Sequence, residues 1–165
     1  MDRDRNQITI GNAFDALDKA ITEWVSSDIA NTDDIEMINE AVKADLNFRD
    51  ILTGLPNHYE LEKCSGFITY FASLVDGLDK VPYISILSAF QFESGDTEGA
   101  LEMVGNALEM NPQYPLAKLL KRVYLAGWPV DSFVLMRNQL DPSVRIKALE
   151  MKDITLGEIK EWANA

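Results

Sequence analysis

The chain has 165 residues, of which 47% are apolar, so it is long enough to bury a hydrophobic core. Its formal net charge of −12 has the wrong sign for a nucleic-acid footprint, which disfavours direct binding of DNA or RNA and adsorption to an anionic membrane. Residues 1–112 carry a net charge of −14 and residues 113–165 a net charge of +2, so the acidic character belongs to the first two thirds of the chain.

The first 80 residues show three apolar stripes with the i, i+3, i+4, i+7 spacing of amphipathic helices. The first two stripes consist of Phe14, Leu17, Ile21, Trp24 and Val25, and of Ile35, Ile38, Ala41, Val42 and Leu46. The third stripe consists of Leu61, Cys64, Phe67, Ile68, Phe71, Leu74, Val75 and Leu78. The segment Ile8–Thr9–Ile10 is the one weak candidate for a strand.

Turn and capping residues set the expected ends of these helices. Thr32 and Asp33 are expected to cap the second helix, and Asn57 with Glu60 is spaced as a cap pair for the third. Gly77 is expected to close the third helix.

Proline and glycine divide the second half of the chain in the same way. Pro82 suits the first turn of a fourth helix that reaches about Glu93. A fifth helix is expected between the Gly95–Asp96 turn and Asn111–Pro112, and a sixth between about Pro115 and Ala126, before Gly127.

The last segment has two further helix starts. Asp141–Pro142 is expected to begin one helix, and Thr155 with Glu158 forms the capping box of the last. Together these elements predict an all-α protein, a single domain of about eight helices over residues 1–165, with no linker long enough to separate domains.

Residues 82–112 resemble one tetratricopeptide unit, in which small residues let two antiparallel helices pack closely. The residues that carry this resemblance are Ile84, Leu87, Gly95, Ala100, Ala107 and Pro112, whereas Ser88 and Gln91 depart from the pattern. Because about three such units are needed for a solenoid, we expect one hairpin with a following helix, residues 82–126, inside a bundle.

A longer resemblance covers roughly residues 35–135. It rests on Arg49–Asp50–Ile51–Leu52 and on the ordered string Gly95–Asp96, Ala100, Ala107–Leu108, Asn111–Pro112, Tyr114, Leu116–Ala117, Leu119–Leu120, Ala126–Gly127 and Pro129. This string resembles the C-terminal part of an actinobacterial family of unknown function that also occurs in bacteriophages. The resemblance implies a helical fold and a phage accessory role, and it implies no activity.

The residues with reactive side chains do not form a recognisable catalytic set. His58 is the only histidine and is expected on an exposed loop, while Cys64 lies on an apolar stripe and is expected to be buried. Asp33, Asp34, Glu36 and Glu40 lack the spacing of a calcium loop and fit helix caps and a solvated face. We therefore predict no catalytic residue, no bound cofactor and no metal site.

These patterns favour a non-enzymatic protein-interaction module with a partner not yet identified. Tyr83, Tyr114 and Trp128 are the candidate contact residues, because aromatic side chains dominate binding hot spots. An acidic nucleic-acid mimic that occupies a DNA-binding protein and a small-molecule enzyme are the alternatives, and a homo-oligomer stays open. The first dozen residues lack the apolar run of a secretory signal, and one cysteine suits a reducing compartment, so we expect a cytoplasmic protein.

Overall fold

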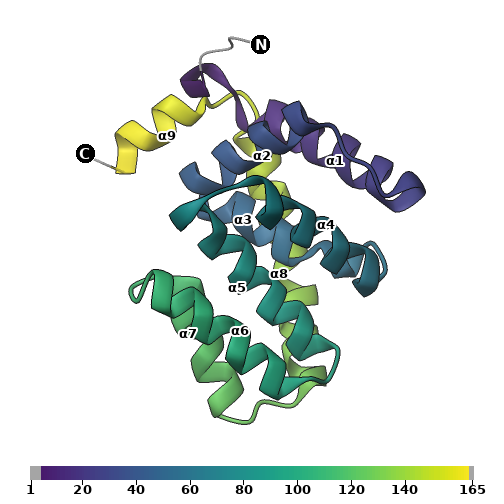
Figure 1. Ribbon diagram of the computed structural model, residues 1–165. Helices are drawn as coiled ribbons and strands as arrows, with labels where there is room; N and C mark the ends of the chain where they lie inside the picture. Colours follow the sequence, from purple (N-terminus) through teal and green to yellow (C-terminus); the bar gives the residue numbers. More distant parts are fainter. Residues whose placement is uncertain (1–4, 164–165) are drawn as a thin grey trace. The chain divides into compact units, whose positions relative to one another are not determined.

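The computed structural model describes residues 5–163, and these residues form nine α-helices and no β-strand (Figure 1). The predicted all-α fold class is therefore confirmed. No helix in this part of the chain is both long and apolar enough to cross a membrane. Residues 1–4, on which part of the expectation about a secretory signal rests, lie outside the described residues. Contacts group the chain into two compact units, residues 1–52 with 141–165 (unit 1) and residues 53–140 (unit 2), which we describe separately.

Unit 1 is built around a pair of packed helices, α1 (Ile10–Ser27) and α2 (Thr32–Ala44). It also contains α3 (Leu46–Thr53) up to the unit boundary, the 3-10 turn η1 (Arg5–Gln7), the second half of α8 (Val130–Glu150) and α9 (Leu156–Ala163). The last helix, α9, packs against α2 and η1. Helix α3 is not predicted by the apolar pattern, because Leu46 fits the end of the preceding stripe. In the structure Leu46 is exposed and begins the new helix.

The starts of α1 and α2 show two different capping arrangements. Thr9 and Asn12 form a capping box, in which each side chain accepts a hydrogen bond from the other residue's amide. For α2, the prediction that Thr32 and Asp33 are the caps is wrong. Thr32 is already helical, and the Asn31 side chain accepts a hydrogen bond of 2.8 Å from the Asp33 amide.

The chain segments around Thr9 and Thr155 lie against each other in unit 1. Their pairing is a single antiparallel bridge, with the Ile10 amide donating to the Ile154 carbonyl and the Leu156 amide to the Ile8 carbonyl. The weak strand expected at Ile8–Ile10 is therefore only this bridge. The predicted capping box of α9 is confirmed by the Glu158 amide, which donates to Thr155 Oγ1 over 3.2 Å.

Unit 2 has α5 (Val81–Glu93) at its centre. This helix contacts α4 (Leu61–Leu74), α6 (Thr97–Met110), α7 (Pro115–Leu125) and the 3-10 turn η3 (Gly77–Lys80), and it buries nine side chains spread around its axis. The turn η2 (Leu55–Asn57) and the first half of α8 complete the unit. Figure 1 shows α5, α6 and α7 side by side.

The hairpin of α5 and α6 matches the sequence prediction in its turn and in its packing. Gly95 adopts a φ of +96°, and its amide donates to the Phe92 carbonyl, which ends α5 as a Schellman turn. Ala100, Val104 and Ala107 are all fully buried on α6. Both alanines are thus buried, as a close contact between the two helices requires.

The start and end of α4 differ from expectation. Glu60 holds the N-cap position without a side-chain hydrogen bond, so the Asn57–Glu60 cap pair does not form. Asn57 Oδ1 instead accepts a hydrogen bond of 2.9 Å from Arg137 Nε, which is 80 residues away in the sequence. At its other end α4 stops at Leu74, three residues before Gly77, which begins η3 with a φ of +58°.

The prediction that Asp141–Pro142 begins a helix is wrong, because both residues lie inside α8. This helix starts at Val130 and continues through Pro142 to Glu150. A proline inside a helix removes one backbone hydrogen bond and usually costs about 3 kcal/mol. The helix persists because buried side chains on both sides of the proline, including Arg137 and Ala148, hold it.

Candidate functional site

The three aromatic residues proposed as contact residues occupy different environments. Tyr83 is fully buried and stacks on Phe71 at 5.1 Å, so it must be removed from the candidate contact surface. It was a candidate because aromatic side chains dominate binding hot spots, but α5 is surrounded by neighbouring helices. Tyr114 is half-buried at the N-cap of α7, and Trp128 is 41% exposed just after α7 ends. Trp128 therefore stays a candidate.

The exposed side of α7 carries large apolar side chains next to cations. Leu119 is 53% exposed and Leu125 is 66% exposed, and Lys118, Lys121 and Arg122 are exposed as well. We call these five residues the α7 outer face. Since residues three and four apart are neighbours on a helix, Leu125 lies one turn from Lys121 and from Arg122. The face therefore alternates positive charge with apolar surface.

The cations of the α7 outer face have no acidic partner within residues 5–163. Lys118 is within 3.4 Å of the neutral Gln113 Oε1, and Lys121 and Arg122 make no ion pair. Helix α7 contains no acidic residue, although unit 2 has ten acids and only six lysines and arginines. Half of the positive charges of an acidic unit are thus gathered on one helix of 11 residues.

The opposite side of α7 is anchored in the core of unit 2. Tyr124 stacks on Phe92 of α5 with a centroid distance of 4.8 Å, and its hydroxyl lies 2.9 Å from Ser88 Oγ. Burial raises the pKa of Tyr124, so this hydroxyl stays protonated and is available as a donor. Gly127 (φ +71°) then ends the helix, and its amide donates a hydrogen bond to the Tyr124 carbonyl. The orientation of the outer face is therefore determined by buried contacts.

The α7 outer face was not among the predicted contact residues, although a signal for it is present in the sequence. The positive charge balance after residue 113 is concentrated on one helix. Within residues 115–125, the cations fall at 118, 121 and 122, all on the side opposite the apolar stripe of Leu116, Leu120 and Val123. A helical projection of this segment alone predicts a basic exposed side.

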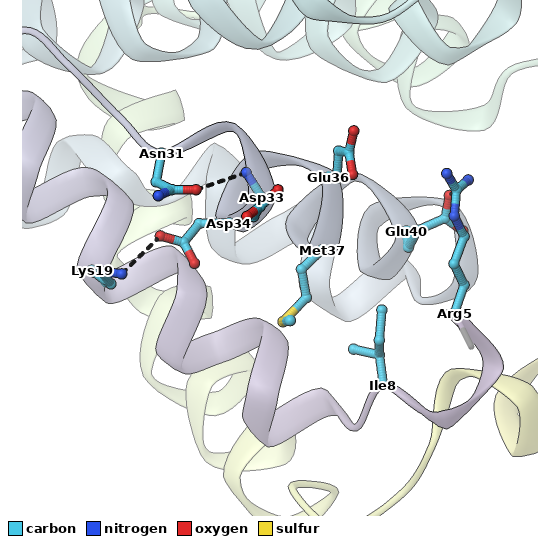
Figure 2. A pocket seen from close by; sticks show the side chains of 9 residues that line it. All are labelled: Arg5, Ile8, Lys19, Asn31, Asp33, Asp34, Glu36, Met37 and Glu40. Carbon is cyan, nitrogen blue, oxygen red and sulfur yellow. Dashed lines mark hydrogen bonds and ion pairs between the residues drawn. The ribbon is translucent and has the colours of Figure 1, made fainter. Parts of the chain in front are cut away.

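Unit 1 has a hollow of about 310 Å³ beside α1 and α2 (Figure 2). It is lined by Arg5, Ile8, Lys19, Asn31, Asp33, Asp34, Glu36, Met37 and Glu40. Figure 2 shows Lys19 paired with Asp34 at one end and Arg5 beside Glu40 at the other, with Met37 and Ile8 between them. All four carboxylates that the sequence analysis assigned to caps and a solvated face thus line one hollow.

The two deeper carboxylates of the hollow are already neutralised by cations. Lys19 Nζ lies 3.5 Å from Asp34 Oδ2, and Arg5 Nη1 donates to Glu40 Oε1 over 2.8 Å. Glu40 is buried and also lies within 3.5 Å of Lys43 Nζ. The lining contains no serine, cysteine or histidine. The hollow can admit a small polar molecule, but its lining offers no recognisable nucleophile with a base.

The two residues considered for catalysis lie in unit 2, in separate environments. His58 is exposed, as predicted, and Cys64 is fully buried, as predicted. Burial raises the pKa of the Cys64 thiol to about 12, so the nucleophilic thiolate is scarce at neutral pH. Among the described residues, no group of three His, Cys, Asp or Glu side chains is placed to hold a metal ion.

A buried ion pair near Cys64 joins two helices of unit 2. Arg137 on the first half of α8 donates to Glu93 at the end of α5 and to Asn57 in η2. Both partners of the ion pair are largely buried, which makes the loss of either one costly. This arrangement attaches α8 to two elements that are distant in the sequence, and it explains why Arg137 is not part of a basic surface.

Comparison of the chain with family models, curated proteins and solved structures finds no match in any of the three. The resemblances to a tetratricopeptide unit and to the actinobacterial family therefore stay predictions, and the geometry of the chain's own residues is the basis for assigning a function.

Proposed function

We propose that the protein is a non-enzymatic protein-interaction module and that the α7 outer face is its docking surface. The observation that carries the proposal is the exposure of Leu119 and Leu125 beside Lys118, Lys121 and Arg122, which have no acidic partner in the described part of the chain. Single exposed leucines are common on monomeric proteins and need no explanation. Their combination with unpaired cations on one side of one helix is what favours docking, because apolar area gives affinity and charge gives orientation.

The packing beneath the face supports this assignment. A docking helix must keep its orientation when a partner binds, and loose helices lose affinity through the entropy of ordering. Helix α7 is held on α5 by the Tyr124–Phe92 stack and by the Ser88–Tyr124 hydrogen bond. The face is therefore preorganised, with its exposed side chains projecting from a fixed backbone.

The nucleic-acid mimic is the less favoured alternative. A mimic needs carboxylates along one face that are free to replace phosphates. In the hollow of unit 1, the carboxylates of Asp34 and Glu40 are instead paired with Lys19 and Arg5.

A small-molecule enzyme is less favoured because the lining of that hollow offers no recognisable nucleophile with a neighbouring general base. The family resemblance adds one element to the proposal, namely that the partner is a protein of a phage host.

Site-specific photocrosslinking in the producing cells tests the docking function. Benzoylphenylalanine is placed at Leu119 on the α7 outer face, and in a matched control at Glu102, which is exposed on the neighbouring helix α6. The proposal expects discrete crosslinked products from position 119 and few from position 102. Equal products from both positions, or none from either, would contradict it.

A further inference from the structure

The geometry points to an acidic amphipathic helix as the partner of the α7 outer face: a segment with leucine-like side chains on one side, flanked by Asp or Glu. This inference rests on the proposed docking function and specifies the chemistry of the partner. It goes beyond that function because a docking surface alone does not say which side chains are recognised.

The spacing of the α7 outer face determines what can be complementary to it. Leu119 is three residues from Arg122, and Leu125 is three residues from Arg122 and four from Lys121, so each leucine has a cation one turn away. Helix α7 spans 11 residues, or roughly 16 Å. Leu119 and Leu125 are six residues apart, about 9 Å along the helix, with Lys121 and Arg122 between them. A partner helix with apolar side chains at a similar separation and carboxylates beside them is therefore complementary to the face.

The surroundings of α7 argue against a polyanion as the occupant. The neighbouring helix α6 exposes Glu98, Glu102 and Glu109, and the rest of unit 2 has an excess of acids. A nucleic acid or an anionic bilayer extends well beyond one helix and would meet this negative charge, which acts over about 8–10 Å at physiological salt. A short acidic segment along α7 places its charges on the three cations only.

The two leucines of the α7 outer face place a second requirement on the partner. A free carboxylate-rich chain would leave Leu119 and Leu125 exposed and would gain only screened electrostatic attraction, which is weak at a surface. Burial of the two leucines needs apolar side chains on the partner, and burying apolar area is the dominant source of association energy. The partner must therefore be both acidic and amphipathic.

Fluorescence anisotropy with designed peptides tests the inference on the full chain. The probe is a fluorescein-labelled peptide of about 14 residues, which spans about 21 Å as a helix, with Leu at i, i+3, i+4 and i+7 and Glu elsewhere. The wild type is expected to bind it saturably and more weakly as NaCl is raised. The double variant Lys121→Glu/Arg122→Glu should bind about tenfold more weakly. The matched control Lys147→Glu/Lys152→Glu reverses two exposed cations of unit 1 and should leave the affinity unchanged.

Two further comparisons make the result decisive. Leu119→Ser/Leu125→Ser should also weaken binding about tenfold, and a scrambled peptide of the same composition should bind poorly, because it lacks an apolar side. The inference is overturned if both charge-reversed variants bind equally, if the scrambled peptide binds as well as the designed one, or if an oligothymidylate or anionic phospholipid vesicles bind α7 more tightly.

The two proposals fail in different ways. Crosslinking at position 119 without charge-dependent binding of the acidic peptide would keep the docking function and refute the partner chemistry. Absence of a crosslink together with peptide binding at positions other than α7 would refute the docking surface itself. Circular dichroism of each variant checks folding, which exposed substitutions should leave intact.

Discussion

The hydroxyl oxygens of Ser88 and Tyr124 lie 2.9 Å apart in the core of unit 2 and join α5 to α7. Ser88 Oγ also donates to the Ser85 carbonyl over 2.7 Å, so its single proton is already used. The Tyr124 hydroxyl is therefore the donor in the bond between the two side chains. The serine that departs from the tetratricopeptide pattern is thus the acceptor that satisfies a buried tyrosine.

Because the Tyr124 hydroxyl is the donor, removing the Ser88 hydroxyl and removing the Tyr124 hydroxyl should lower stability by unequal amounts. Ser88→Ala leaves the buried Tyr124 hydroxyl without its acceptor and should lower the free energy of unfolding by about 1–3 kcal/mol. Tyr124→Phe leaves Ser88 bonded to the Ser85 carbonyl and should cost only about 0.5–1.5 kcal/mol. Urea denaturation of the single variants and the double variant checks this, and the double variant should lose less than the sum. Strict additivity would show that the bond does not form.

Gly99 and Gly105, both on α6, should respond in opposite ways to alanine. A Cβ on Gly105 meets nothing within 4 Å, so Gly105→Ala should stabilise the helix by about 0.5–1 kcal/mol. A Cβ on Gly99 would lie 2.4 Å from Asp96 Oδ2. Asp96 caps α6 through the Gly99 amide, and this bond, with a second from Gln91, lowers the pKa of Asp96.

Gly99→Ala therefore should give no comparable gain, because the new methyl group displaces the capping carboxylate. Thermal unfolding of the two variants provides the measurement, with the wild type as reference. An equal rise in Tm for both would mean that the Asp96 cap contributes nothing to the stability of α6.

The close packing of α5 and α6 predicts a contrast between Ala100 and Glu102. Ala100 is fully buried, and Ala100→Leu must displace neighbouring helices or adopt a strained rotamer, at a cost of about 1–3 kcal/mol. Glu102 is exposed on the same helix, and Glu102→Leu should change stability by less than about 0.5 kcal/mol. Denaturant midpoints of both variants decide the matter. A neutral Ala100→Leu would remove the support for a tightly packed hairpin.

The buried thiol of Cys64 predicts a loss of stability in alkaline solution. Its pKa is about 12 in the folded chain and 9.0 as a free group, so above pH 9 the unfolded chain binds fewer protons than the folded one. The contribution of the neutral thiol is complete below pH 9 and is lost as the pH rises toward 12. Urea unfolding across this range should show the wild type losing stability faster than Cys64→Ala. Parallel curves would indicate a solvated thiol.

Local chemistry explains which elements were predictable from the sequence. Gly95 and Gly127 occupy left-handed conformations that few other residues adopt, so the ends of α5 and α7 could be located from the sequence alone. The capping box of Thr155 and Glu158 depends on residues three apart, and it is present at the start of α9. The burial of Cys64, Ala100 and Ala107 follows from helical periodicity, because each lies on an apolar stripe.

Tertiary contacts decided what the sequence left open. Tyr83 is buried because α5 is enclosed by α4, α6 and α7, and a helix with neighbours on every side has no exposed side to predict from its own residues. Asn57 accepts from Arg137 rather than capping α4, since a guanidinium 80 residues away competes with the local amide. Long-range contacts also pair Lys19 with Asp34 and Arg5 with Glu40, whereas the cations of α7 have no acidic partner among residues 5–163. Periodicity can place a charge on the outside of a helix, but whether that charge finds a partner depends on which helices pack beside it.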